Sequence, residues 1–321
     1  MKGEPMEITQ RTHEGPMPGT PEWQEARRVH ITASEIAAVM GMSEYKTAYE
    51  VWAEKMGLMP AFTGNESTAR GHRYEAAILG DYADRNEVEL RYPLPLIECS
   101  TLPCLAATPD AQWVARDFRL VEAKFSMSAN RAAELGEEGT DAIPYDWLLQ
   151  TQAQMECVDV EFADVAVLLY GRLRVFNVRR HPDITAAIRD AATELSERIA
   201  NNDPPEPDYR HPRTLQVLRA IHGVKGDVKI TLDAGTVEAW HIYKQTGDKI
   251  KSLEEIRDEA QARVLSAMGD AAVGELGDGY EVSRSRVSES LWTDADIAEI
   301  SAKLGQVKRN GYVTLRQRKA K

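Results

Sequence analysis

Three prolines within four residues divide this chain more sharply than any other feature of its sequence. They are Pro204, Pro205 and Pro207, and they follow the polar residues 201–203. A proline ring fixes φ and removes a backbone N–H, so neither a helix nor a central strand continues through this stretch. The 321 residues also amount to about two domains of ordinary size. We therefore expect residues 21–203 and 204–321 to form separate domains, preceded by a flexible lead-in over residues 1–20.

Helical and strand-like segments alternate before this linker. The alternation predicts an α/β fold with a central mixed sheet flanked by helices. Capping-box spacings from Thr32 to Glu35 and from Thr47 to Glu50 begin two short helices. The longer helices are expected over 67–85, 145–157 and 183–201, and the strands over 88–92, 96–100, 111–115, 118–125, 163–170 and 173–179.

The second domain has a simpler pattern, which predicts a smaller α+β fold. Apolar residues recur at three- and four-residue steps over 236–268, so we expect one long helix, or two helices separated at Gly247. Two strand-like segments follow, over 279–287 and 311–318, and both begin with Gly-Tyr.

Composition excludes several classes of protein. The chain has 39 Lys and Arg against 51 Asp and Glu, a net charge of −12, which argues only against binding nucleic acid through an overall positive field. Its three cysteines include no Cys-x-x-Cys, so a disulfide framework, a zinc knuckle and an iron–sulfur cluster are poorly supported. No apolar run approaches the length of a membrane helix. These features favour a cytoplasmic protein.

Two short motifs place chemically reactive side chains together. A tight turn at residues 116–117 would pair residue 111 with residue 122 and put Asp110 one position from Glu122. Glu122 and Lys124, at i and i+2 of one strand, share a face. Two carboxylates repel unless a cation neutralises them, and their oxygens suit Mg²⁺ or Mn²⁺. These groups are the parts of metal-assisted phosphodiester hydrolysis; a surface hairpin with a solvated Glu–Lys pair is the alternative.

Polar residues on two predicted helices can extend this group. Glu75 lies within the helix that precedes the sheet, where a solvated surface glutamate is the alternative. Gln150 and Gln154, four residues apart, share one face of the later helix, whereas Gln152 lies on another. Glutamines in a packing helix suggest hydrogen bonds to a site, although a solvated face would also explain them.

Five motifs in this order resemble the YqaJ-type phage recombinase nucleases. That group includes the lambda-type alkaline exonuclease and belongs to the PD-(D/E)xK nuclease superfamily, so the resemblance implies a restriction-endonuclease-like sheet. It covers about residues 20–200. The motifs are Trp23-x3-Arg27-x4-Thr32-Ala-Ser34-Glu35, Gly71-x2-Tyr74-Glu75, Thr108-Pro109-Asp110, Glu122-Ala-Lys124 and Gln150-Thr-Gln152.

The resemblance also assigns roles to the residues of the metal site. Asp110, Glu122 and the carbonyl of Ala123 would bind the metal, which is Mg²⁺, as two ions, with Mn²⁺ as a substitute. Lys124 would be the catalytic lysine. The remaining assignments are that Glu75 orients a metal-bound water and that Gln152 positions Lys124.

A second group of residues would bind the 5′-phosphate of a DNA end. The resemblance gives this role to Arg27, Ser34 and Thr32, which suits the bidentate contacts of arginine and the free N–H groups at a helix start. The implied activity is a Mg²⁺-dependent 5′–3′ exonuclease on double-stranded DNA, in the cytoplasm of a bacterial host. It would leave 3′ single strands for recombination with an annealing partner protein.

Several alternatives stay open at this point. A structure-specific repair endonuclease of the same superfamily is the nearest, a non-catalytic DNA-end binding module is the next, and glycoside hydrolysis by the carboxylates is a distant third. The family's ring-shaped trimer is in doubt because of the domain after the linker, so the oligomeric state is open.

The second domain carries a further DNA-binding prediction. If its two Gly-Tyr strands pair antiparallel, alternate basic residues would form a DNA clamp on one face. A solvated strand face and an acidic partner protein are the alternatives. The clamp residues would be Arg284, Arg286, Arg316 and Arg318.

Overall fold

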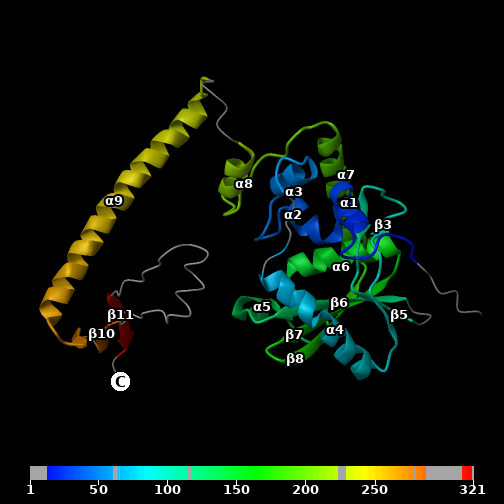
Figure 1. The fold of residues 1–321 in the computed structure, drawn as a ribbon, viewed down its shortest axis with the longest axis horizontal. Helices are drawn as coiled ribbons and strands as arrows, with labels where there is room; N and C mark the ends of the chain where they lie inside the picture. Colours follow the sequence, from blue (N-terminus) through cyan, green and yellow to red (C-terminus); the bar gives the residue numbers. More distant parts are fainter. Residues whose placement is uncertain are drawn as a thin grey trace, which may run out of the picture. The chain divides into compact units, whose positions relative to one another are not determined.

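The structure, a computed structural model, divides the chain into two compact units, Met1–Lys225 and Gly226–Lys321 (Figure 1). Each unit is described by itself. The turn predicted at residues 116–117 lies outside the described residues. These are 13–60, 64, 66–114, 118–222, 229–277, 279–286 and 313–319, with the backbone alone at 67, 286 and 313–319.

A five-stranded mixed sheet, in the order β2-β5-β6-β7-β8, is the centre of the first unit. Its neighbouring strands are antiparallel except for β6 and β7, which are parallel. Parallel neighbours require a crossover, and the chain makes it through α5 and α6. The bounds are β2 Leu90–Arg91, β5 Ala111–Trp113, β6 Arg119–Ser126, α5 Ala129–Glu134, α6 Tyr145–Val158, β7 Phe162–Leu169 and β8 Arg172–Arg179.

Helices cover both faces of this sheet, as the predicted fold class requires. On one face α4 (Glu66–Asn86) packs Leu79 and Tyr82 against Val121 of β6. On the other face α6 packs Met155 against Leu120 of the same strand. Because side chains alternate along a strand, β6 presents its even-numbered residues toward α6. The fold class is confirmed, and the two faces of β6 fall where the sequence placed them.

A second, smaller layer lies beside α6. Three short strands in the order β1-β4-β3 pack with α2, α3 and α7 around a core that contains Ile36, Leu105 and Ile188. The bounds are α1 Pro21–Val29, β1 Ile31–Thr32, η1 Ala33–Glu35, α2 Ile36–Val39, α3 Ala48–Lys55, β3 Ile97–Glu98, β4 Leu105–Ala107, α7 Pro182–Ala200 and α8 Thr214–Ile221.

The register of the β5–β6 hairpin differs from the prediction by one residue. Ala111 pairs with Val121, not with Glu122. The predicted register assumed a two-residue turn, whereas β5 ends at Trp113 and β6 begins at Arg119, which leaves a five-residue connection. Extended by one position, the observed register brings Asp110 directly opposite Glu122.

The limits of the first unit also differ from the prediction. Beyond Pro207, α8 still packs on this unit, where Thr214 and Val217 are buried. Before α1, the described part of the lead-in is held in place, because Leu96 N–H donates to the Pro16 carbonyl at 2.9 Å and His13 hydrogen-bonds to Gln112 at 3.0 Å. The prolines therefore mark a loop within the first unit.

The second unit contains one long helix and a three-stranded antiparallel sheet in the order β11-β10-β9. The helix runs through Gly247 without a break. No heavy atom lies within 4 Å of a Cβ added there, and an exposed helical glycine costs only about 1 kcal/mol. The bounds are α9 Ala234–Met268, β9 Val273–Glu275, β10 Tyr280–Arg286 and β11 Val313–Lys319.

The two strands that begin with Gly-Tyr pair antiparallel, as predicted, but their register corrects the proposed clamp. Arg284 pairs with Leu315, and Ser283 pairs with Arg316. Residues that pair directly across a ladder share a face. Arg284 and Arg286 therefore occupy positions of one face and Arg316 and Arg318 positions of the other, because the observed register differs by one residue from a pairing that would put all four on one face.

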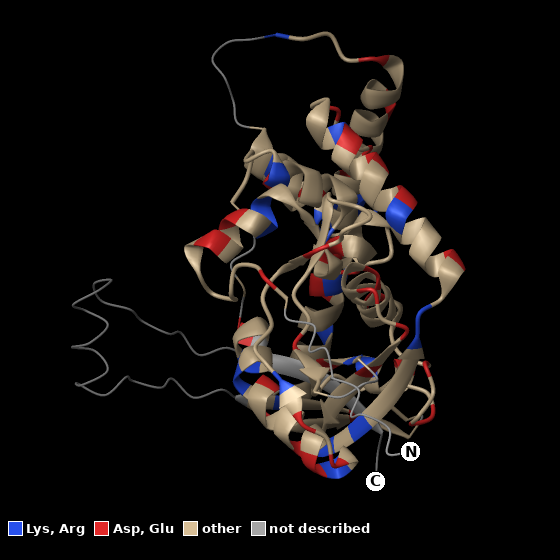
Figure 2. Cartoon of the chain, turned by 90° about the vertical axis from the view of Figure 1, so that its right-hand side faces the viewer, with Lys and Arg blue, Asp and Glu red and all other residues tan. Residues whose placement is uncertain are grey.

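Charged residues are interspersed along the helices. Figure 2 shows acidic and basic positions next to each other on the same elements, so the net charge of −12 is not gathered on one helix. No helix among the described residues has both the length and the apolar character needed to cross a membrane.

Candidate active site

The loop before β5 and the strand β6 bring Asp110, Glu122 and Lys124 together. The Oδ2 atom of Asp110 accepts a hydrogen bond from the N–H of Ala123 at 2.7 Å, which fixes this carboxylate beside the strand. Glu122 is buried, and Lys124 is half-buried on the same face. The sequence predicted this convergence, and the hydrogen bond to Ala123 explains how it is maintained.

Glu122 accepts hydrogen bonds from three side chains, two of which belong to α6. The Nζ of Lys124 donates to Oε1 at 2.7 Å, and the Nε2 of Gln150 donates to the same oxygen at 2.6 Å. The Nε2 of Gln154 donates to Oε2 at 2.7 Å. Gln150 also accepts from Lys124 through Oε1 at 3.0 Å. Gln150 thus holds the carboxylate and the ammonium at once.

Gln152 does not make the contact that the family resemblance implies. Its Nε2 donates to the carbonyl of Arg179 at 2.7 Å, and its Oε1 accepts from the N–H of His181 at 2.9 Å. Gln152 therefore ties α6 to the end of β8, and Gln150 takes the place beside Lys124. The physical reason is helical periodicity, since a residue two positions from Gln150 points about 200° away around the helix.

Negative charge exceeds positive charge at this site. Burial, followed by the nearby carboxylates of Glu122 and Glu75, raises the pKa of Asp110 well above its usual range, although Lys124 and the Ala123 N–H act in the opposite direction. Burial alone would lower the pKa of Lys124, but the charges of Glu122 and Asp110 outweigh it and raise that pKa. Lys124 is therefore a firmly held cation.

Glu75 approaches the site from α4. Its carboxylate is 34% exposed and lies 3.4 Å from His72 Nδ1. The neighbouring Tyr74 stacks on Phe125 of β6 with the ring centroids 4.5 Å apart, which fixes this part of α4 against the strand. Glu75 thus belongs to the same electrostatic group as Asp110, as its effect on the pKa of Asp110 shows.

The chemistry of these groups suits a divalent cation. Asp110 and Glu122 are oxygen donors, and one lysine does not neutralise the carboxylates around it. Hard oxygen donors are what Mg²⁺ and Mn²⁺ select. Within the described ranges, no set of three or more His, Cys, Asp or Glu is already gathered as a metal site. The fit therefore rests on two carboxylates and on the raised pKa of Asp110.

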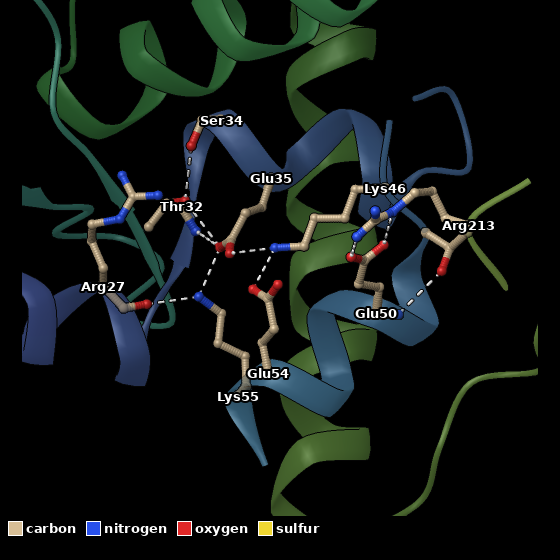
Figure 3. A network of polar contacts seen from close by, with 10 residues as sticks. Arg27, Thr32, Ser34, Glu35, Lys46, Glu50, Glu54, Lys55 and Arg213 are labelled. Atoms are coloured by element: carbon tan, nitrogen blue, oxygen red, sulfur yellow. Dashed lines mark hydrogen bonds and ion pairs between the residues drawn. The ribbon is translucent and has the colours of Figure 1, made fainter. Parts of the chain in front are cut away.

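A second polar cluster contains the residues expected to bind a phosphate. The guanidinium of Arg27 lies over the ring of Trp23, 4.7 Å from its centroid. Trp23 Nε1 in turn donates to Thr108 Oγ1 at 3.0 Å, which connects α1 to the segment that carries Asp110. Figure 3 shows Arg27 beside the Thr32–Ser34 end of η1, where Ser34 is exposed and its hydroxyl lies 3.2 Å from Thr32 Oγ1.

Arg27 is available to a ligand. In the part of the chain that the structure describes, no carboxylate forms an ion pair with its guanidinium. The predicted group Arg27, Thr32 and Ser34 is thus brought together, with one unpaired cation. Sequence reasoning did not single out Lys55 and Lys46, which lie behind this group (Figure 3). Lys55 is the last residue of α3 and Lys46 lies just before the N-cap of that helix, and no signal in the sequence marks either of them.

Comparisons with known proteins agree with the motif-based resemblance. Residues 22–161 match the model of the YqaJ-like viral recombinase domain. The uncharacterized protein YqaJ of Bacillus subtilis strain 168 is 21% identical over 277 residues, which are 85% of each chain.

Two solved structures are also similar. An alkaline exonuclease of Laribacter hongkongensis (LHK-Exo) has a TM-score of 0.47 at 19% identity and covers 57% of this chain and 94% of its own. A phage-related exonuclease of Haemophilus somnus 129PT has a TM-score of 0.43 at 14% identity and covers 54% of this chain and 96% of its own.

Proposed function

Because residues 22–161 match the model of the YqaJ-like viral recombinase domain, we propose that the chain is a phage-type DNA exonuclease. It degrades one strand of double-stranded DNA from the 5′ end. One observation carries this proposal above the others: the buried Glu122 holds Lys124 at 2.7 Å beside Asp110, in a group that needs a cation. Binding alone does not require such clustered carboxylates.

The residues that would hold Mg²⁺ are Asp110, Glu122 and the carbonyl of Ala123. A bound metal would polarise the phosphodiester and lower the pKa of a water ligand. Gln150 and Gln154 orient the carboxylate of Glu122. Lys124, whose ammonium is held by Glu122 at 2.7 Å, would supply a positive charge to the phosphate. Glu75 is a further carboxylate near Asp110 that can orient a water or accept its proton.

The 5′ polarity rests on the cluster around Arg27. A guanidinium with no carboxylate partner among the described residues is suited to a bidentate contact with a terminal phosphate. The exposed hydroxyl of Ser34 can turn its one proton from Thr32 to the same phosphate. The link from Trp23 to Thr108 would keep this group in a fixed relation to Asp110. Digestion would leave a 3′ single strand, the substrate of an annealing partner in recombination.

One assay tests this function against its alternatives. Linear duplexes labelled at either end, and a closed circle of the same sequence, are incubated with Mg²⁺ or with EDTA. We expect Mg²⁺-dependent shortening of the linear DNA from its 5′ ends and an intact circle. Cutting of the circle would favour an endonuclease. Binding of DNA ends without cleavage in Mg²⁺ and in Mn²⁺ would instead favour a non-catalytic end-binding module.

A further inference from the structure

Two carboxylates and two lysines form a largely buried network next to Arg27 and Ser34 (Figure 3). Its members are Glu35, Glu54, Lys46 and Lys55. The side chain of Lys55 is 6% exposed and that of Glu35 is 8% exposed. Lys55 Nζ lies 2.8 Å from Glu35 Oε2. Lys46 Nζ lies 2.5 Å from Glu54 Oε2 and 3.5 Å from the other oxygen of Glu35. Charges buried this deeply are costly unless they are paired.

Lys55 connects the two sides of the phosphate-binding group. Its Nζ also donates to the backbone carbonyl of Arg27 at 2.7 Å. The Glu35 oxygen that accepts from Lys55 also accepts from the N–H and the hydroxyl of Thr32, both at 2.9 Å. Since the Thr32 hydroxyl donates to Glu35, the contact at 3.2 Å is a donation from Ser34 to Thr32. One chain of hydrogen bonds thus runs from the end of α1 to Ser34.

The charges within this network cancel, so the positive charge of Arg27 is not neutralised by it. Burial opposes ionisation of Glu35, but Lys55 and Lys46 and the bonds from Lys55 and Thr32 outweigh it and lower its pKa to about 2. Glu35 is therefore an anion, and it is paired within the network. Two carboxylates and two ammonium groups cancel, so no acidic group of this network is left to attract the guanidinium of Arg27.

We propose that Lys55 is a positioning residue that sets the spacing between Arg27 and Ser34 and so determines the preference for a 5′-phosphorylated DNA end. This inference rests on the proposed function, because it assumes that the group around Arg27 binds a terminal phosphate. Lys55 itself does not touch the DNA. Its ammonium holds the last turn of α1 against Glu35 and fixes where the guanidinium of Arg27 is presented.

The chain offers a matched control for this role. Lys46 pairs with the same carboxylate and is also largely buried, at 18% side-chain exposure, but it has no bond to α1. Lys46→Met removes one cation from the network, as Lys55→Met does. A general effect of unbalanced charge would appear in both variants. An effect on the spacing of Arg27 and Ser34 would appear in Lys55→Met alone.

The experiment measures binding and cleavage separately. Equilibrium dissociation constants are determined in Ca²⁺ for one hairpin duplex with a 5′-phosphate and for the same duplex with a 5′-hydroxyl. Cleavage of both duplexes in Mg²⁺ gives KM and kcat, and urea unfolding reports the stability of each variant. A double variant, Glu35→Gln with Lys55→Met, removes both members of the ion pair, so it tests the spacing without an unpaired buried carboxylate.

We expect Lys55→Met to lower the preference for the 5′-phosphate by roughly tenfold or more, since small misplacements of a binding group have effects up to about 100-fold. The loss should appear in the dissociation constant and in KM, with kcat on the 5′-hydroxyl duplex unchanged. The double variant should show the same loss, Lys46→Met little of it, and Lys55→Arg a partial recovery.

Two results would overturn the inference. One is an unchanged preference in the folded Lys55→Met or double variant, and the other is an equal loss in Lys46→Met. The proposed function fails in a different way, through absence of cleavage by the unmodified protein in Mg²⁺. In that case the binding constants in Ca²⁺ still decide the role of Lys55.

Discussion

Replacing Gln150 and Gln152 of α6 by leucine, one at a time, would show which of the two serves the reaction. Gln150 donates to Glu122 at 2.6 Å and accepts from Lys124 at 3.0 Å, whereas both bonds of Gln152 go to backbone atoms near the end of β8. Leucine is close to glutamine in volume and makes no hydrogen bonds. Gln150→Leu and Gln152→Leu thus remove the same number of bonds from the same helix.

The structure sets different magnitudes for the two changes. A hydrogen bond to a charged group contributes about 1.5–3 kcal/mol. Gln150 is half-exposed, so water can replace part of its role, and we take the loss of one such bond as the net effect. Because each 1.36 kcal/mol is about a factor of ten in rate, cleavage should slow by roughly 10- to 100-fold in Gln150→Leu.

Gln152→Leu should mainly lower stability. It removes the hydrogen bonds to the Arg179 carbonyl and the His181 N–H, at about 0.5–1.5 kcal/mol each, and changes the cleavage rate by less than about threefold. Single-turnover cleavage of a 5′-phosphorylated duplex at saturating protein measures the first effect, and urea unfolding measures the second. A slow but stable Gln152→Leu together with a fully active Gln150→Leu would refute this reasoning.

Four further outcomes are expected. Asp110→Asn should abolish Mg²⁺-dependent cleavage while the unfolding midpoint stays within a few degrees or rises, because a charge that burial, Glu122 and Glu75 disfavour is removed; full activity would contradict the site. Arg27→Ala should erase the faster digestion of 5′-phosphorylated over 5′-hydroxyl ends, and equal rates on both ends in the unmodified protein would contradict the pocket. The pKa of Glu35 is about 2 in the folded state against an ordinary 4.5. Glu35 should therefore stabilise the fold by about 3 kcal/mol above pH 4.5, and this stabilisation should be lost as the pH falls toward 2. Glu35→Gln should flatten this pH dependence of the unfolding free energy, measured by urea unfolding between pH 7 and pH 3. Charge reversal of Arg284 and, separately, of Arg316 should reduce the salt dependence of duplex binding in only one of the two variants, since the register puts these residues at positions of opposite faces. The slope of log K against log[salt] should fall by about 0.9 for each phosphate that the protein no longer neutralises. No change in either variant would leave the second unit as a scaffold.

Long, regular patterns made the architecture predictable from the sequence. The helices α4, α6, α7 and α9 and the strands β6, β7 and β8 all span six residues or more, so their periodicity could be read without knowledge of the fold. The strands β1 and β4 have two and three residues, too few for any alternation. Their pairing depends on packing around residues distant in sequence, such as Ile36 and Ile188.

The part of the candidate site that depends on local spacing was also predictable from the sequence. Spacing in a strand placed Glu122 and Lys124 on one face, and spacing in a helix separated Gln150 and Gln154 from Gln152. The motif-based assignment then chose Gln152, and here the simpler periodicity argument was the better guide. Lys55 could not be found, because its role depends on a carbonyl 28 residues earlier, and no local pattern encodes such a contact.

The parallel pairing of β6 with β7 has a consequence for when the site can form. The crossover between these strands contains α6, so the glutamines that hold Glu122 reach it only after a long loop has closed, which is a slow, non-local folding event. During synthesis from the N-terminus, a chain that ends before α6 already carries Asp110, Glu122 and Lys124 but lacks their supports. We expect such nascent chains to be inert toward the genome of the cell that makes them.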